Sequence, residues 1–196
     1  MRYLLLLPLL VLLLTCREQK TTTATGDVAP TGEIVTGSVN PRNRLVENRD
    51  EVGNGEQALV LRMGDAEAAP GDQACLPVEV SNFRDLIGFQ FTVRFDSASL
   101  KFETLRNFGL PGYGSGNFGV RFAERGYLST LWTENNLQGV TRPDGTPIVE
   151  ICFTNLMGKG QRTEVKFQDG PTKFEVIGAA MDKRKIRHAA GVVVSR

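Results

Sequence analysis

The sequence has few of the residues that most enzymes use for catalysis. It contains one histidine, one tryptophan and three cysteines in 196 residues. It has no Gly-x-Ser-x-Gly nucleophile motif, no His-Glu-x-x-His zinc motif and no Gly-x-x-x-x-Gly-Lys phosphate loop. Glu103, Glu124, Glu134 and Glu150 are candidates for a glycosidase carboxylate pair, but nothing in their spacing places two of them across a cleft. We therefore expect a protein that is not an enzyme and needs no cofactor.

The chain also lacks an excess of charge of either sign. Its formal net charge is +1, and this falls to zero when residues 1–15 are removed, because Arg2 is the only charged residue among them. Nucleic-acid binding draws most of its affinity from neutralisation of phosphates by Lys and Arg. The short basic run at residues 183–185 is expected to be a solvated turn. A nucleic-acid partner is therefore not expected.

The only long apolar run lies at the N-terminus. Tyr3–Leu14 follows a single positive charge and is shorter than the roughly 20 apolar residues that span a bilayer. It fits the h-region of a secretory signal peptide, and the Leu-Leu-Thr-Cys that ends it resembles a bacterial lipoprotein signal. An ordinary signal peptide with an incidental cysteine is the alternative. We expect residues 1–15 to be the signal peptide and Cys16 to be lipidated, which gives an extracytoplasmic protein anchored at a bacterial outer membrane or cell surface.

Residues 16–56 have the composition of a linker. They are rich in Thr, Gly, Asn, Pro and charged residues and have few large apolar side chains. Such a segment cannot bury enough apolar surface to offset its ordering entropy, so it is predicted to be a largely disordered tether. A coil of about 40 residues has an r.m.s. length of roughly 35 Å. The lipidated tether would therefore hold the folded part clear of the membrane.

From residue 57 to residue 196 the pattern changes to short apolar runs separated by turn residues. In 87–95, phenylalanines and a valine alternate with Gly88, Gln90, Thr92 and Arg94, which is the period-2 pattern of a strand with one buried face. The other expected strands are 58–63, 74–80, 100–105, 118–122, 127–133, 148–156, 163–167, 174–177 and 191–194. No stretch shows sustained helical periodicity. This pattern predicts an all-β domain, a two-sheet jelly-roll β-sandwich of about nine strands.

Several segments follow one another in an order typical of a known family. They are Ala-Pro-Gly-Asp at 69–72 with Leu-Pro-Val at 76–78, then 87–96 with 100–102, 126–134, 144–153 and 191–194. In this order and spacing they resemble the cohesin domain, the receptor half of the cohesin–dockerin pair of cellulosomes. The resemblance covers residues 57–196. It implies a cohesin-like sandwich that binds a dockerin-like protein partner without catalysis.

The resemblance also implies where the partner binds. Cohesins receive dockerin on the flat outer face of the sheet made by their strands 8, 3, 6 and 5, and alternation selects the side chains that face outward there. These are Gly88, Gln90, Thr92, Val120, Phe122, Ser129, Leu131, Thr133 and Glu134. Leu131 and Phe122 would be apolar anchors, and Gln90 and Glu134 would orient the partner through hydrogen bonds. The alternative is that these residues form only a solvated sheet face.

In the cohesin order, the strands that carry Cys75 and Cys152 are antiparallel neighbours, with both side chains pointing outward on the same side. A disulfide between them is expected in an oxidising compartment, and two buried free thiols are the alternative. Metal ligation is not expected, because only His188 could join the two cysteines. Cys16, the odd cysteine, would be consumed by lipid.

A carbohydrate-binding module of a polysaccharide-utilisation system is the alternative function. Sugar-binding sites present coplanar aromatic rings, and Tyr113 and Phe118 in and beside the glycine-rich segment 109–116 could form a small platform. Trp132 is instead expected in the core, and His188 is expected to be structural or solvated rather than a general base. The protein is expected to be a monomer.

Overall fold

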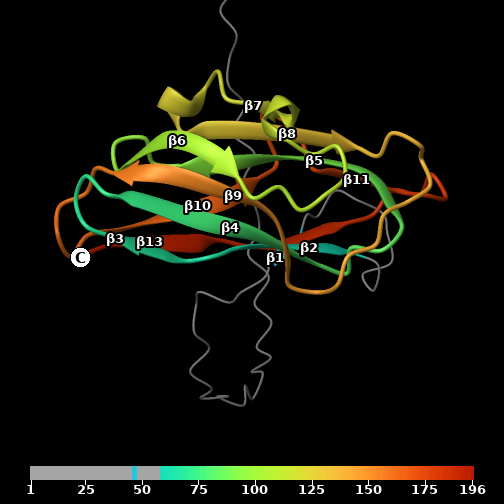
Figure 1. Ribbon diagram of the computed structural model, residues 1–196, viewed down its shortest axis with the longest axis horizontal. Coiled ribbons are helices and arrows are strands. Elements are labelled where there is room, and N and C mark those ends of the chain that lie inside the picture. The colour runs from blue at the N-terminus through green and yellow to red at the C-terminus, as the bar shows by residue number, and fades with distance from the viewer. Residues whose placement is uncertain (1–45, 48–57) are drawn as a thin grey trace, which may run out of the picture. The chain divides into compact units, whose positions relative to one another are not determined.

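The computed structural model describes residues 46–47 and 58–196, and it places them in two packed β-sheets (Figure 1). In sheet order, the first sheet, sheet A, contains β1 (Val46–Glu47), β12 (Ile186–Ala189), β2 (Leu59–Met63), β4 (Gln73–Ser81), β9 (Thr146–Asn155) and β6 (Leu100–Arg106). The second, sheet B, contains β3 (Ala66–Ala68), β13 (Gly191–Ser195), β10 (Arg162–Gln168), β5 (Leu86–Phe95), β8 (Tyr127–Thr133) and β7 (Phe118–Gly119), with β11 (Glu175–Gly178) also paired to β5. Two short 3₁₀ helices, η3 (Ser115–Asn117) and η4 (Ala123–Arg125), flank β7. The prediction of an all-β, two-sheet sandwich is confirmed.

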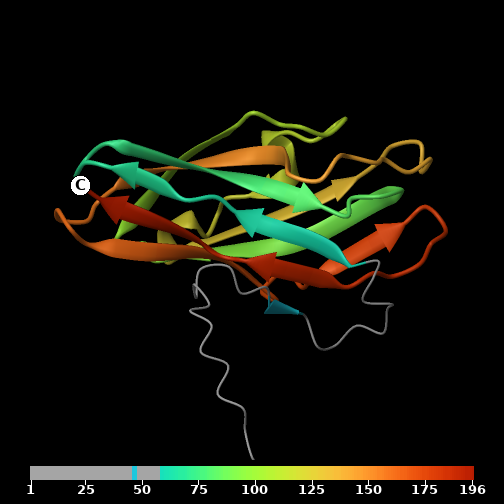
Figure 2. The same cartoon turned by 90° about the horizontal axis from the view of Figure 1, so that it is seen from below.

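Every segment expected to be a strand contains one, but three short strands were not predicted. β3 has only three residues, and β12 pairs in parallel with β2 across more than a hundred residues of sequence (Figure 2). Such non-local pairing leaves no periodic signal in a short segment. β1 falls inside the segment expected to be a tether and pairs with β12. The segment 118–122 contains only the two-residue β7, because the chain turns into η4 directly after it.

The core lies between the two sheets and is rich in aromatic rings. Trp132 is fully buried, as predicted, and its indole N–H donates a 2.8 Å hydrogen bond to the Pro111 carbonyl. The Phe89 ring lies 5.4 Å from Trp132 and 5.6 Å from Tyr113, centroid to centroid. Each large side chain buried in this way contributes about 1.5–3 kcal/mol of transfer free energy. Because alternate side chains of each strand point inward, the burial of these side chains holds the two sheets together.

Asn155 ties the two sheets together at one end of the sandwich. It is fully buried at the end of β9, and its amide nitrogen donates to the Ala68 carbonyl at 3.0 Å and to the Ser195 hydroxyl at 2.9 Å. Its amide oxygen accepts a 3.0 Å bond from the Met157 N–H. Ala68 and Ser195 belong to sheet B, so this side chain of sheet A joins the two sheets. Its hydrogen bonds satisfy buried polar groups that would otherwise need water.

The N-terminal predictions lie largely outside the described residues. They are the signal peptide at 1–15, the lipidation of Cys16 and, apart from 46–47, the tether at 16–56. All of them stay predictions. Within 46–47 and 58–196, no helix has the length and apolar character needed to cross a membrane.

Candidate partner-binding face

Two neighbouring strands of sheet B, β5 and β8, bring six of the predicted contact residues onto one face. Their antiparallel register sets Gly88 opposite Thr133, Gln90 opposite Leu131, and Thr92 opposite Ser129. Residues directly opposite one another in such a pair point to the same side, with Cβ atoms about 5 Å apart. The alternation read from the sequence therefore places these residues on the side of the sheet away from the core.

Only part of this set is accessible to a partner. Leu131 is 52% exposed, Thr133 is exposed, and Gln90 and Ser129 are half-buried. Thr92 is fully buried, because its hydroxyl donates to the Thr172 carbonyl at 2.8 Å and accepts from the Thr172 N–H at 3.0 Å. Thr172 lies in the connection between β10 and β11, which covers this position. The prediction of an exposed Thr92 is therefore wrong, and Gly88 is buried too.

Glu134, at the end of β8, is buried and used within its own turn. One carboxylate oxygen accepts a 3.0 Å bond from the Asn136 N–H, and the other accepts a 2.8 Å bond from the Gln138 N–H. Both bonds hold the loop that leaves β8. The expectation that this carboxylate orients a partner does not match the structure, since its acceptor atoms already serve the loop.

Val120 and Phe122 do not lie on a strand, contrary to the prediction. Both follow β7 in the turn that leads into η4, and both are exposed. The turn ends at Gly126, whose φ of 77° lies in the left-handed region and where a Cβ would collide with the Phe95 carbonyl. Val120 lines a depression of about 490 Å³ together with Leu156 of the segment after β9. The strand register assumed for these residues is therefore wrong.

Four further positions complete the outward face and were not among the predicted contacts, one on β5 and three on β10 and β11. β10 and β11 both pair with β5, which sets Glu175 opposite Gln90, Gln168 opposite Thr92, and Lys166 opposite Arg94. Arg94 alternates with the inward phenylalanines just as Gln90 does, so alternation alone could have selected it. The partners contributed by β10 and β11 could not be selected in this way, because they depend on strand pairing.

The Phe95 end of β5 carries a charged depression. It has a volume of about 620 Å³, and the charged side chains that line it are Arg94, Asp96, Arg162, Glu164 and Lys166. The Arg94 guanidinium lies 4.0 Å from the centroid of the Tyr127 ring and donates to the Arg125 carbonyl. Hydrogen bonds from the Ser99 hydroxyl and the Ala98 N–H hold the pKa of the Asp96 carboxyl below its usual value. The depression is thus part of the same sheet face as Gln90 and Leu131.

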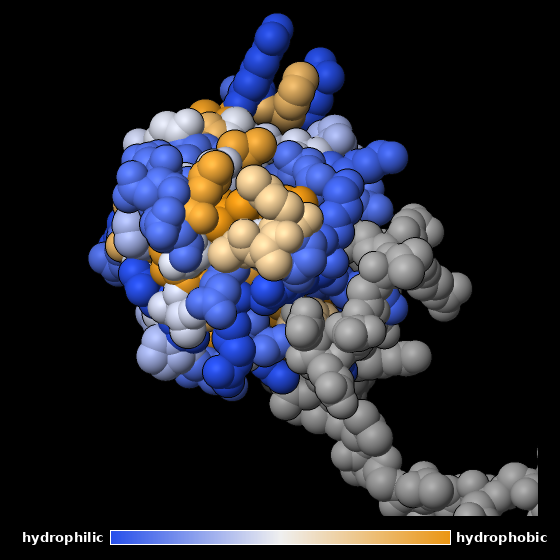
Figure 3. Space-filling view, turned by 90° about the vertical axis from the view of Figure 1, so that its right-hand side faces the viewer, coloured by the Kyte–Doolittle hydropathy of each residue, from blue (hydrophilic) through white to orange (hydrophobic). Residues whose placement is uncertain are grey.

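The Leu86 end of β5 carries an apolar patch instead. Figure 3 shows apolar side chains gathered on one end of the molecule. The exposed Leu137 and Met181 lie in two loops near Leu86, one after β8 and one after β11. The loops touch, since a Cβ on Gly139 would lie 3.0 Å from the Ala179 Cβ. Leu137 and Met181 both have a left-handed backbone, with φ of 55° and 59°. This conformation is uncommon for such residues and costs on the order of 1–2 kcal/mol each.

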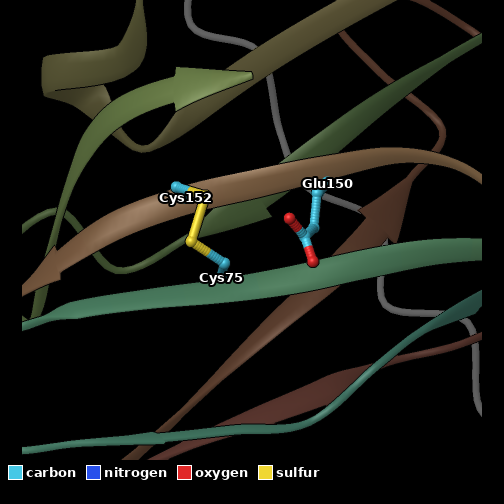
Figure 4. Close-up of side chains that lie close together, drawn as sticks. All are labelled: Cys75, Glu150 and Cys152. Carbon is cyan, nitrogen blue, oxygen red and sulfur yellow. A yellow bond between two sulfur atoms is a disulfide. The ribbon is translucent and has the colours of Figure 1, made fainter. Parts of the chain in front are cut away.

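Cys75 and Cys152 lie on the outer face of sheet A and form a disulfide, as predicted (Figure 4). They are directly opposite in the β4–β9 register, with Cα atoms 4.0 Å apart. Cys152 is fully buried. Glu150 lies beside them, close enough for the three side chains to share a metal ion. The disulfide uses both sulfurs, however, and one Glu150 oxygen accepts from Arg106 at 2.6 Å.

Tyr113 is placed differently from the prediction of a sugar platform, whereas His188 has the structural position that the prediction allowed. Tyr113 is buried, its hydroxyl lies 2.8 Å from the Thr130 hydroxyl, and burial raises its pKa. It therefore cannot stack on a sugar. His188 is half-buried against the rings of Phe167 and Phe174, at centroid distances of 5.9 and 5.2 Å. Burial lowers the pKa of this imidazole, because charging it there costs solvation.

Comparison with known proteins identifies the architecture. The family model described as "Cohesin domain" matches residues 59–175. A cohesin from a type I cohesin–dockerin complex of Clostridium thermocellum is similar in structure, with a TM-score of 0.60 and 19% identity over 71% of this chain and 99% of its own. The seventh ScaB type I cohesin of Pseudobacteroides cellulosolvens is similar at a TM-score of 0.58 and 14% identity, covering 71% and 92%.

A third similar structure is described as non-cellulosomal. It is a cohesin from the archaeon Archaeoglobus fulgidus, with a TM-score of 0.50 and 14% identity over 69% of this chain and 89% of its own. No curated protein matches the chain. At these identities the structural likeness shows the fold, a jelly-roll sandwich, and the family match covers most of the described sandwich.

Proposed function

This chain belongs to the cohesin domain family, whose members are protein-binding modules, and on that premise we propose that it binds a dockerin-like protein through the outer face of β5 and β8. The mechanism is binding without catalysis. Anchored through a lipidated Cys16 in the cell envelope, the module would act as a monomeric receptor and hold its partner at the outer membrane or cell surface.

The exposure of Leu131 is the observation that most supports this proposal. β8 pairs with β5 along its whole length, which sets Leu131 directly opposite Gln90, and the two-residue β7 pairs with β8 at the adjacent Ser129 and Thr130. A large side chain that is 52% exposed there, between half-buried Gln90 and Ser129, has apolar surface that a flat partner could cover. Binding energy at protein interfaces concentrates in such central anchors surrounded by polar groups.

A panel of purified dockerin modules, each titrated against the immobilised chain, tests the proposal. At least one module is expected to bind with a defined Kd. Leu131→Asp should weaken that binding by about thirtyfold or more, as loss of a central anchor typically does. Leu156→Asp is the matched control, since Leu156 is 50% exposed but follows β9 of sheet A.

Two results would count against this function. One is equal binding by the Leu131→Asp and Leu156→Asp variants, which would remove the β5–β8 face from the interface. The other is an absence of binding to every dockerin module together with retention on a polysaccharide column. That second result would favour the carbohydrate-binding alternative.

A further inference from the structure

The outward face of sheet B contains a pair of like charges in direct opposition. Lys166 of β10 lies directly opposite Arg94 of β5 in the strand register. Like charges in this position destabilise a strand pair. Among the residues that the structure describes, neither Lys166 nor the nearby Arg162 has an ion-pair partner. Arg94 itself lies over the Tyr127 ring and donates to the Arg125 carbonyl, so Arg162 and Lys166 are the cations of the depression that the fold leaves without an ion pair in the described part of the chain.

The acidic residues at this depression neutralise only part of its positive charge. Asp96 already accepts bonds from the Ser99 hydroxyl at 2.6 Å and the Ala98 N–H at 3.0 Å, so it serves the turn that follows β5. Glu164 lies between Arg162 and Lys166 on β10 and makes no ion pair in the described part of the chain. Three cationic and two acidic side chains line the depression, a formal excess of one positive charge.

The face is therefore polarised along β5. Its Phe95 end is the cationic depression, and its Leu86 end adjoins the two touching loops that carry the exposed Leu137 and Met181. The ten residues of β5 separate these ends by about 30 Å at 3.3 Å per residue. This is the length of a helix of about 20 residues. A partner helix or strand lying along β5 would contact both ends at once. In only one of its two directions would the acidic end of the partner lie at the cationic depression.

We propose that the partner is a protein whose acidic side chains occupy the depression formed by Arg94, Arg162 and Lys166, and whose apolar side chains cover Leu137 and Met181. The inference rests on the proposed function and adds the chemistry and direction of the bound partner. Carboxylates in the depression would lie between Lys166 and Arg94 and offset their repulsion. The apolar patch at the opposite end would reject the same acidic segment, so the partner is held in one direction.

The double variant Arg162→Glu/Lys166→Glu tests whether binding requires these positive charges. Its affinity is measured for the dockerin module that bound in the panel. Its Kd is expected to rise at least about tenfold, because each reversal replaces an attraction with a repulsion. Lys101→Glu/Lys159→Glu is the matched control, since both of its residues are exposed, neither lines the depression or lies near the Leu86 end of β5, and the charge change is the same. The control should stay within about twofold of the wild-type Kd. An equal loss in both variants, or no loss in either, overturns the inference.

Ionic strength and direction provide separate readouts on the same complex. Wild-type binding should weaken as NaCl is raised from low to high concentration, whereas the double variant should lose most of this dependence because the attracting cations are gone. A spin label placed at one end of the partner's docking segment should broaden amide signals at only one end of β5. Broadening at both ends would overturn the inferred single direction.

If no dockerin module binds, the proposed function fails, but the depression can still be tested with a ten-residue poly-glutamate peptide. Amide shifts on titration are expected at 94–96 and 162–168, and they should vanish in the Arg162→Glu/Lys166→Glu variant. Polygalacturonate serves as the acidic glycan for comparison. Absence of shifts in these segments, or shifts with polygalacturonate and none with the peptide, would overturn the assignment of an acidic protein as ligand.

Discussion

Removing the Cys75–Cys152 disulfide is expected to lower the free energy of unfolding by about 4 kcal/mol. The two residues are 77 apart in the sequence, so the bond closes a long loop in the unfolded chain. The loop-closure relation gives about 4.5 kcal/mol at 25 °C for a loop of this length. Replacing fully buried Cys152 by alanine also leaves a small cavity, and residual structure in the unfolded chain acts in the opposite direction.

The variant to compare is Cys75→Ala/Cys152→Ala, measured by urea unfolding with tryptophan fluorescence. Trp132 is the only tryptophan and is fully buried, so its emission reports loss of the core directly. For about 140 folded residues, a loss of 4 kcal/mol corresponds to a fall in Tm of roughly 13 °C. Wild-type protein treated with a phosphine reductant should unfold at nearly the same urea concentration as the variant, and the variant should not respond to the reductant.

One result would refute this reasoning. If mass spectrometry shows both thiols free in the reduced wild-type protein and its unfolding midpoint is unchanged, the disulfide does not restrict the unfolded chain as assumed. A lower midpoint accompanied by a larger m-value would agree with the prediction, because an uncrosslinked chain exposes more surface on unfolding.

Three further changes test particular contacts. The folded-state pKa of His188 is lowered from 6.5, so stability should fall as the pH drops below about 6.5 toward the folded value. Thermal melts of His188→Gln between pH 7.5 and 5 should show a flatter dependence; an unchanged slope would assign the effect to another group. Asn155→Ala should cost about 3 kcal/mol in urea unfolding by leaving buried groups of both sheets without partners, and a loss below about 1 kcal/mol would contradict this tie. Thr130→Val should cost about 1–3 kcal/mol by orphaning the buried Tyr113 hydroxyl. Adding Tyr113→Phe should recover part of that loss, and no recovery would show that the hydroxyl pair is not its cause.

The strands and the core could largely be predicted because they depend on alternation between adjacent residues. In β5 the outward Gln90 and the buried Phe91 follow directly from the period-2 pattern, and Trp132 in β8 was placed in the core by the same reasoning. The cysteine pair was found through the family's strand order, which made Cys75 and Cys152 neighbours. These inferences succeed because a buried sheet face strongly selects apolar side chains.

The accessible part of the candidate face could not be predicted in this way. Thr92 has the right orientation, but it is covered by Thr172, which lies 80 residues along the chain. Glu134 has a charged side chain, but its carboxylate is used by the amides of its own loop. Val120 lies in an apolar alternation typical of a strand, but the turn that ends at Gly126 interrupts the strand there. In each case a neighbour in space, rather than the residue's own type, decides its exposure.

Some features of this protein are therefore determined by the sequence alone, and others only by the tertiary structure. The amino-acid pattern was sufficient for the all-β class, the inward residues of each strand and the family resemblance, since these depend on local periodicity and on the order of segments. Only the tertiary structure showed that Lys166 opposes Arg94 and that the loops carrying Leu137 and Met181 meet. Strand register and loop contacts join residues far apart in the sequence, and the energy of those contacts belongs to the pairs rather than to either residue alone.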